Sequence, residues 1–352
     1  MRPVVVAAVR MGYGHLRAAR PLAQALGVPL ARADAAPFAG PLEAALWSGT
    51  RASYEGLSRL AATRGGPFAR ALDTITAIEG GDAPDPATRA LDRALALGLG
   101  RRLADGLGDA TLLTTFYAPA LAADRAGRPA RLVVTDTDCA RAWAPVDPAY
   151  GRLVYCAPTD GVAARLAGFG VPRARVAVTG FPLPPALVRT AEADLARRMT
   201  RLRGDEPLRV VLAVGGAGAQ VDLAREVVAG LDARVWISAG TRPEVARALA
   251  GVGEVVAGDT FEAYADRFDE VLADADVLWT KPSELVFYAA LGIPIVAAPP
   301  VGVQEARNLA WLRQHGAVVD ARASRGELAD AAERAFAGLT RDGTERVIAT
   351  LT

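Results

Sequence analysis

Short β-rich runs alternate with longer helical patterns along this chain, an order typical of a parallel α/β fold. In each half, an apolar strand runs directly into a glycine-containing loop and then a helix. This duplication predicts two facing Rossmann-like, doubly wound α/β domains with a cleft between them. The predicted strands are Val4–Val9, Ala110–Thr114, Arg131–Thr135, Leu153–Cys156, Arg175–Val178, Arg209–Val214, Arg234–Ser238, Glu254–Ala257, Asp276–Trp279 and Pro294–Ala298. The predicted helices include Leu16–Leu26, Val221–Leu231, Pro243–Leu249, Glu284–Leu291 and Glu305–Arg313.

The length of 352 residues also favours two domains, because it exceeds what one hydrophobic core usually organises. A proline-rich turn followed by a charged stretch, between Pro182 and Pro207, is typical of a boundary. The N-terminal domain then spans 1–185 and the C-terminal domain 186–352.

Residues 38–108 do not follow the α/β alternation and predict a helical insert in the first domain. One interpretation is that its apolar faces pack onto that domain. The other is a basic amphipathic surface that receives a hydrophobic acceptor or a lipid headgroup. The apolar residues concerned are Trp47, Tyr54, Leu57, Leu60 and Phe68.

Charge and cysteine content exclude several classes of protein. The chain has 40 basic and 39 acidic residues, a net charge of +1 and no block of like charge, which argues against nucleic-acid binding. Two cysteines, Cys139 and Cys156, give neither a disulfide framework nor a metal-site spacing and suit a reducing cytosol. The apolar run Met1–Val9 is too short for a signal peptide or a membrane span. We therefore expect a cytoplasmic protein, with peripheral contact at the inner membrane face left open.

Lys281 is the only lysine in the chain and stands at the end of a predicted strand. Ser283 is positioned to cap a helix that begins at Glu284. A strand, a turn and a helix N-terminus together favour an anion, because unpaired N–H groups and the helix dipole both attract negative charge. A compact ammonium suits a phosphate in the same way. The alternative interpretation is an ordinary surface lysine in a loop.

A glycine-rich loop also follows the first strand and ends in His15, one of two histidines. Gly12 and Gly14 allow the backbone to approach a ligand or adopt positive φ. His15 then lies in the first turn of a helix at the carboxyl edge of the sheet, where open α/β folds bind ligands. It is a candidate general base, or else a side chain that only bonds a loop carbonyl. His315, beside Gly316 at a helix end, fits a structural role.

Two aspartates follow the third predicted strand, in Val133-Val-Thr-Asp-Thr-Asp138, with Trp143 close behind. An Asp-x-Asp pair can hold a divalent metal on a sugar nucleotide, but the pair alone is a weak signal. Asp136 is a second candidate base, or a residue that orients His15. A loop-capping role for both Asp136 and Asp138 is the alternative.

The second half carries two further polar loops. Gly215, Gly216 and Gly218 lie between a strand and a helix, where a glycine-rich turn can cradle a diphosphate. Gln304 and Asn308 are one helical turn apart, so both side chains can address one polyol, with the Glu305 carboxylate beside them. The alternative for the latter group is a polar surface helix.

In this order, the motifs resemble those of the inverting glycosyltransferases with two facing Rossmann-like domains, the GT-B family. They are similar to monogalactosyldiacylglycerol synthase and to the N-acetylglucosaminyltransferase that forms lipid II. The likeness covers most of the chain outside the helical insert. It rests on the loop ending at His15, Thr135-Asp136 with Trp143, Val154–Pro158, Val178–Pro182, Gly215–Ala219, Lys281-Pro with Gly292–Pro294, and Gln304-Glu305 with Asn308.

The resemblance implies metal-independent, inverting transfer of a sugar from a nucleotide-diphosphate donor, such as a UDP-sugar, to the hydroxyl of a small molecule or lipid. It implies no cofactor beyond that co-substrate. The implied catalytic residues are His15 and Asp136. The implied donor site is Gly215, Gly216, Gly218, Lys281, Ser283, Glu284, Gln304, Glu305 and Asn308. The implied acceptor site is Gly12, Tyr13, Gly14, Asp138 and Trp143.

Two positions depart from the family pattern. Tyr13 stands where the family usually has glycine, and Phe287 where it has a ribose-binding glutamate. Glu284 lies one turn earlier and replaces that glutamate only if the helix shifts. Two alternatives to a transferase therefore stay open: a sugar-nucleotide 2-epimerase, which shares the architecture, and a non-catalytic nucleotide-sugar-binding protein.

Overall fold

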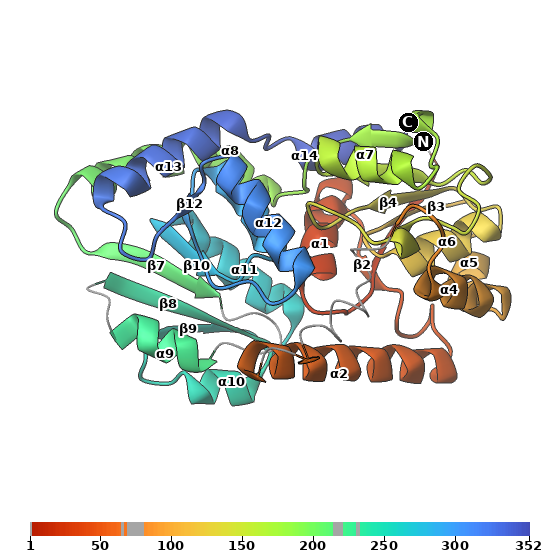
Figure 1. Ribbon diagram of the computed structural model, residues 1–352, viewed down its shortest axis with the longest axis horizontal. Coiled ribbons are helices and arrows are strands. Elements are labelled where there is room, and N and C mark those ends of the chain that lie inside the picture. Colours follow the sequence, from red (N-terminus) through yellow and green to blue (C-terminus); the bar gives the residue numbers. More distant parts are fainter. Residues whose placement is uncertain (1, 65–66, 69–80, 214–220, 230–232) are drawn as a thin grey trace. The chain divides into compact units, whose positions relative to one another are not determined.

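The computed structural model describes residues 2–64, 67–68, 81–213, 221–229 and 233–352. The chain divides into two compact units (Figure 1). Unit 1 comprises Met1–Leu57, Arg70–Pro185 and Asp342–Thr352, and unit 2 comprises Ser58–Ala69 and Ala186–Arg341. None of the described helices combines the length and the apolar character needed to cross a bilayer.

Unit 1 is built on a six-stranded sheet in the order β2-β1-β3-β4-β5-β6, and all of its strand pairs are parallel. From β1 the chain adds β2 on one side and then β3 on the other, so the winding direction reverses between β1 and β3. The strands are β1 (Val4–Ala8), β2 (Leu30–Arg32), β3 (Thr111–Thr114), β4 (Ala130–Val133), β5 (Val154–Ala157) and β6 (Val176–Val178). The helices beside them are α1 (Gly14–Leu26), α6 (Tyr117–Arg125), α7 (Asp160–Gly168) and α14 (Gly343–Ala349).

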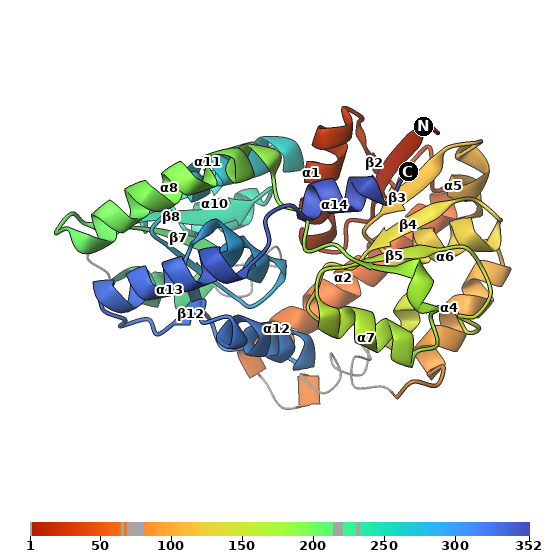
Figure 2. The ribbon, with the colours of Figure 1, turned by 90° about the horizontal axis from the view of Figure 1, so that it is seen from above.

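Unit 2 also has a parallel six-stranded sheet, in the order β12-β11-β10-β7-β8-β9; here the chain adds β8 and β9 on one side of β7 before the winding reverses between β7 and β10. Helices α10 and α11 pack beside β8 and β9, whereas α12 and α13 pack beside β12 (Figure 2). The strands are β7 (Leu208–Ala213), β8 (Ala233–Gly240), β9 (Glu254–Ala257), β10 (Val277–Thr280), β11 (Ile295–Ala297) and β12 (Val318–Val319). The helices are α8 (Pro185–Arg203), α9 (Val221–Ala229), α10 (Pro243–Ala248), α11 (Phe261–Ala273), α12 (Val303–Gln314) and α13 (Arg325–Gly338).

The predicted fold class is confirmed, and each strand predicted from the sequence is present. The sequence missed β2 and β12, which have 3 and 2 residues and lie at sheet edges. Their residues are only half-buried, so the apolar pattern that identifies a strand is weak there.

The predicted helix Glu284–Leu291 is a 3-10 helix, η3, and not an α-helix. Every residue from Leu285 to Leu291 is buried, so the segment has no polar face of the kind that marks a surface helix. Gly292 ends it in the left-handed region at φ 69°, and a Cβ at this position would lie 2.8 Å from Leu195 Cδ1. A tightly wound, fully buried segment therefore follows the Lys281 turn.

The last residues of the chain belong to unit 1, which corrects the prediction that 186–352 forms the second domain. Thr344 Oγ1 donates to the Leu183 carbonyl at 2.8 Å, and Arg131 Nε donates to the Thr350 carbonyl at 2.7 Å. Helix α14 also packs beside α1. The C-terminal segment 342–352 therefore packs on residues of the predicted N-terminal domain.

The region predicted as a helical insert contains α2 (Pro41–Arg64), α4 (Pro86–Ala96) and α5 (Arg101–Gly106), while its residues 69–80 lie outside the described part of the chain. Trp47 on α2 is only 8% exposed and packs edge-on against Phe116, as the packing interpretation expects. On the same helix Leu42 and Leu46 are 89% and 56% exposed, so its N-terminal part also presents apolar surface.

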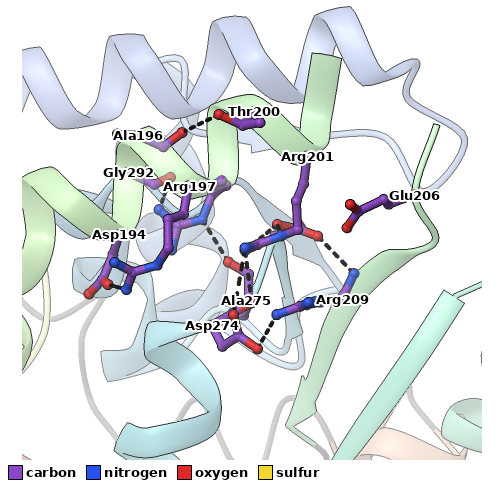
Figure 3. Close-up of polar contacts among 12 residues, drawn as sticks. Asp194, Ala196, Arg197, Thr200, Arg201, Glu206, Arg209, Asp274, Ala275 and Gly292 are labelled. Atoms are coloured by element: carbon purple, nitrogen blue, oxygen red, sulfur yellow. Dashed lines mark hydrogen bonds and ion pairs between the residues drawn. The ribbon is translucent and has the colours of Figure 1, made fainter. Parts of the chain in front are cut away.

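A buried arginine pair ties α8 to the sheet of unit 2. Arg198 donates to the carbonyls of Ala275, Leu291 and Gly292 at 2.7, 3.1 and 3.0 Å. Arg201 Nε donates to Asp276 Oδ1 at 2.8 Å, and Figure 3 shows Arg201 and Arg209 converging on the segment that carries Asp274 and Ala275. These contacts hold both the start of β10 and the end of η3, the two segments that enclose the Lys281 turn.

Replacing Arg198 with methionine is expected to destabilise the protein by roughly 2–3 kcal/mol, because three carbonyls lose their donors. Burial lowers the pKa of the Arg198 guanidinium to about 10, which leaves it protonated at neutral pH. Urea denaturation followed by circular dichroism measures the change. Arg203→Met on the same helix is the control, since it breaks only an exposed ion pair with Glu333 and should shift stability by at most about 0.5 kcal/mol. Equal midpoints for the two variants would contradict the structural role.

Both cysteines are free thiols buried in unit 1. Burial raises the pKa of Cys139 to about 12 and that of Cys156 to about 11. Because the thiolate is the reactive form, we expect the native protein to react with a disulfide reagent at pH 8 roughly a hundredfold more slowly than the urea-unfolded chain. Absorbance of the released thiol measures both rates, and a fast native reaction would show that one thiol is accessible.

Candidate functional site

The first group of candidate residues lies at the carboxyl edge of the unit 1 sheet, where its winding reverses. Strands β1, β3 and β4 are neighbours, with Ala7 paired to Thr114 and Thr114 paired to Leu132. The loops that leave these strand ends therefore meet at one edge. This is the position at which open α/β sheets bind ligands.

His15, the second residue of α1, is held by the residue that follows β3. Its Nδ1 lies 2.7 Å from the carbonyl oxygen of Thr115, and Thr115 Oγ1 donates to the His15 carbonyl at 2.8 Å. A carbonyl oxygen only accepts hydrogen bonds, so Nδ1 carries a proton. In the neutral ring the lone pair then resides on Nε2. This is the form of imidazole that accepts a proton at Nε2.

Aromatic rings pack around the His15 imidazole. Phe116 meets it edge-on, with centroids 4.8 Å apart and planes at 90°, and the Trp143 ring lies 6.3 Å away. Tyr117 stacks on Phe116 at 4.5 Å and contacts Trp143 at 5.3 Å. Burial, and secondarily the charge of Asp85, raises the pKa of the Tyr117 phenol. Aromatic rings therefore surround the imidazole, and Trp143, predicted as an acceptor-site residue, is one of them.

Of the two glycines before His15, Gly12 has the positive φ that the sequence allows and Gly14 does not. Gly12 adopts φ 77°, a region that favours glycine, and Gly14 is the first residue of the helix. Tyr13 occupies the N-cap position and is buried, at 9% exposure. Its carbonyl accepts from Arg17 N at 2.7 Å. The acceptor-binding roles of Gly12, Tyr13 and Gly14 stay predictions.

The two aspartates after β4 have different surroundings. Asp138 Oδ1 accepts from Cys139 N at 2.7 Å and lies 3.9 Å from Arg165 Nε, which is the loop-capping arrangement. Asp136 is half-buried, and its Oδ2 lies 3.4 Å from Thr135 Oγ1, which in turn lies 3.5 Å from His15 Nδ1. Asp136 is thus near the imidazole, with the Thr135 hydroxyl between them. Among the described residues, no three His, Cys, Asp or Glu side chains cluster as metal ligands would.

The second group of candidates lies at the corresponding edge of the unit 2 sheet. The last residues of β10 and β7, Thr280 and Ala213, are register partners at the winding reversal. Lys281 follows the first of them directly. The predicted diphosphate loop, with Gly215, Gly216 and Gly218, follows the second and lies outside the described residues.

Lys281 forms an ion pair that joins the turn after β10 to the first turn of α12. Its Nζ lies 2.8 Å from Glu305 Oε1, and Glu305 Oε2 accepts from Val301 N at 2.8 Å. Asn308 Nδ2 donates to the Pro282 carbonyl at 3.1 Å. The sequence predicted sugar-binding roles for Glu305 and Asn308. Both side chains brace the Lys281 turn, with Glu305 9% and Asn308 1% exposed, and their sugar-binding roles stay predictions.

The other predicted donor residues surround this turn. Ser283 precedes η3 at the N-cap position but makes no side-chain cap hydrogen bond, which corrects the capping role expected for it. Glu284 and Gln304 are half-buried in the first turns of η3 and α12. Phe287 is buried and packs on Trp311 with centroids 5.0 Å apart, so it is part of the apolar packing.

Sequence reasoning missed Thr115 and Phe116, the residues that contact His15 from the end of β3. The sequence does predict the strand Ala110–Thr114. The position of its carboxyl end beside the glycine loop could have identified the two residues that follow it. Recognising it required the strand order, which places β3 directly beside β1.

Sequence comparison finds relatives over about half of the chain. A processive diacylglycerol β-glucosyltransferase from Bacillus subtilis is 25% identical over 173 residues, which are 47% of this chain and 44% of the relative. The enzyme of the same name from Bacillus cereus is 26% identical over 173 residues, with the same coverage. The chain thus spans about half the length of the curated relatives it matches. Residues 171–241 match the model of a domain of unknown function, DUF6938.

Structure comparison extends over the whole chain. Acinetobacter baumannii MurG has a TM-score of 0.51 at 14% identity and covers 99% of both chains. A UDP-GlcNAc 2-epimerase from Neisseria meningitidis, bound to UDP-GlcNAc, has a TM-score of 0.51 at 12% identity and covers 100% and 99%. At these identities the similarity shows the fold. With its two parallel six-stranded sheets, the chain has the two-domain Rossmann-like fold of these GT-B proteins, as its motifs predicted.

Proposed function

We propose that this protein is an inverting, metal-independent glycosyltransferase that uses a nucleotide-diphosphate sugar, such as a UDP-sugar. The names of the curated relatives favour transfer of a hexose. The observation that carries the proposal is the state of His15, whose Nδ1 proton is bound by the Thr115 carbonyl at the switch point of the first sheet. That arrangement equips Nε2 to take a proton from an acceptor hydroxyl.

In this proposal unit 1 supplies the base. As the acceptor oxygen bonds to the anomeric carbon, its proton passes to His15 Nε2 and the bond between that carbon and the diphosphate oxygen breaks. Direct displacement inverts the configuration at the anomeric carbon. Asp136 is the alternative base, and its position beside Thr135 also suits stabilisation of the imidazolium.

Unit 2 supplies the donor site in this proposal. Lys281 directly follows β10, whose last residue, Thr280, pairs with Ala213 of β7, and the predicted glycine loop follows β7 in the sequence. In the structure the ammonium donates to Glu305, and as a compact point charge with three donors it can also bind a phosphate oxygen. Stabilising the developing charge on the departing diphosphate is the role that such a cation performs best. Ser283, Glu284 and Gln304 border this turn and are proposed to contact the nucleotide sugar.

The acceptor in this proposal is a small molecule or a lipid. A lipid acceptor is favoured by the names of the curated relatives and by the exposed Leu42 and Leu46 of α2, which lie four residues apart and so share one face. Peripheral contact with a membrane follows from that choice. Co-sedimentation with anionic lipid vesicles, compared for the native chain and a Leu42→Ser/Leu46→Ser variant, tests it.

Product analysis by mass spectrometry tests the proposed reaction. The protein is incubated with a panel of nucleotide-diphosphate sugars, each with and without small alcohols, sugars and diacylglycerol. The proposal expects a glycosylated acceptor with inverted anomeric configuration, formed equally well in the presence of EDTA. Conversion of a donor in the absence of any acceptor would identify an epimerase instead. Donor binding detected by calorimetry, without turnover on any acceptor, would identify a binding protein.

A further inference from the structure

The contact between His15 and Thr115 is reciprocal. The ring of His15 donates from Nδ1 to the Thr115 carbonyl at 2.7 Å, and the Thr115 hydroxyl donates to the His15 carbonyl at 2.8 Å. Residues separated by 100 positions in sequence are thereby joined twice, across the switch point between β1 and β3. The bond from the Thr115 hydroxyl fixes the start of α1 against the Thr115 backbone. It therefore also sets the distance between His15 Nδ1 and the Thr115 carbonyl.

The first bond also selects a tautomer. An isolated neutral imidazole of histidine prefers its proton on Nε2, which would leave Nδ1 as the basic nitrogen. A carbonyl at hydrogen-bond distance from Nδ1 reverses that preference, since it can only accept. Phe116 packs edge-on against the His15 imidazole and so helps to hold the imidazole in this orientation.

We propose that Thr115 is a positioning residue, whose hydroxyl holds its own carbonyl against His15 Nδ1 and so keeps the Nε2 lone pair for catalysis. The catalytic consequence rests on the proposed function, but the tautomer itself does not. The nearby Thr135 hydroxyl is at 3.5 Å from Nδ1, a longer and weaker contact than that to Thr115. The carboxylate of Asp136 reaches the ring through that hydroxyl, and it therefore has a secondary role in the orientation.

Nitrogen NMR of protein labelled with ¹⁵N-histidine reads the tautomer directly. The chain has only His15 and His315, so two pairs of ring signals are expected, and a His315→Gln variant assigns them. At neutral or alkaline pH the wild-type His15 should show a protonated Nδ1 and an unprotonated Nε2. Finding the proton on Nε2 in the wild type would overturn the proposal without any variant.

Two substitutions then test the hydroxyl. Thr115→Val keeps the branched shape but removes the donor, and should move the His15 signals toward the Nε2-protonated form. Thr115→Ser keeps the hydroxyl and should retain the wild-type signals. His315 is an internal control, because its Nδ1 lies 2.9 Å from the Trp311 carbonyl in unit 2 and should not respond. Unchanged His15 signals in a folded Thr115→Val protein would overturn the role of the hydroxyl.

Kinetics separate this inference from the proposed function. With a donor and acceptor that the protein turns over, Thr115→Val should lower kcat by roughly three- to tenfold, the loss expected for one neutral hydrogen bond. KM for the donor should stay within about twofold of wild type, and Thr115→Ser should restore kcat. Thr111→Val is the matched control, because Thr111 is also a buried threonine but lies at the opposite end of β3. A tautomer shift with unchanged kcat would uphold the positioning of the ring and reject His15 as the base.

Discussion

Glutamine in place of His15 is expected to lower kcat by roughly 10²- to 10⁴-fold, the usual contribution of a positioned general base. The reason is local: the amide of glutamine can donate to the Thr115 carbonyl, but it offers no basic nitrogen in place of Nε2. Affinity for the nucleoside diphosphate should stay within about twofold, since the donor is proposed to bind unit 2. Steady-state kinetics and calorimetry on the same preparation measure the two effects separately.

His315→Gln is the matched control for this prediction. It removes the other histidine, whose Nδ1 bonds a carbonyl one helical turn earlier, and should leave kcat at the wild-type value. Asp136→Asn should be measured beside it, because Asp136 is the alternative base. If His15→Gln retained a kcat within about threefold of wild type while Asp136→Asn lost it, the base would be Asp136.

The location of both candidate groups could be predicted from sequence, because it depends on local pattern alone. Apolar strands that run into glycine or polar loops place those loops at the carboxyl edge of a parallel sheet. His15, Asp136 and Lys281 all follow strands that were recognised in this way, and the structure places each at such an edge. The doubly wound, parallel character of both units was likewise predicted from the duplicated strand, loop and helix, whereas their strand orders were not.

The partners of these residues could not be predicted, because they depend on register and tertiary packing. The sequence predicts Glu305 and Asn308 as ligand-binding side chains on a polar helix, but not their contacts with Lys281 and the Pro282 carbonyl. The 3-10 winding of η3 could not be predicted either. Its residues from Leu285 to Leu291 are all buried, so the sequence lacks the alternation of apolar and polar faces that identifies the type of a helix. The return of Asp342–Thr352 to unit 1 depends on contacts with Leu183 and Arg131 that no local pattern encodes.

Removal of the Lys281 ammonium is expected to lower turnover by roughly 10- to 1,000-fold, the range for loss of one charge that stabilises a leaving group. Binding should weaken more for a nucleoside diphosphate than for the nucleoside, because the ammonium would contact the phosphates. Lys281→Met alone leaves the buried Glu305 carboxylate without its counter-ion and can destabilise unit 2. The informative protein is therefore the double variant Lys281→Met/Glu305→Gln.

In that double variant both charges are removed together, and the glutamine oxygen can still accept from Val301 N. The double variant thus separates an effect on folding from an effect of the lost charge. If its melting temperature is near that of wild type and its turnover is still reduced, the loss of turnover is due to the missing ammonium. Glu305→Gln alone should keep the leaving-group contact and so retain more activity than the double variant. Arg203→Ala, which removes an exposed ion pair on α8, is the control for a general loss of positive charge in unit 2. Full turnover by a stable double variant would show that Lys281 and Glu305 serve only to join the turn after β10 to the first turn of α12, and the diphosphate would need another cation.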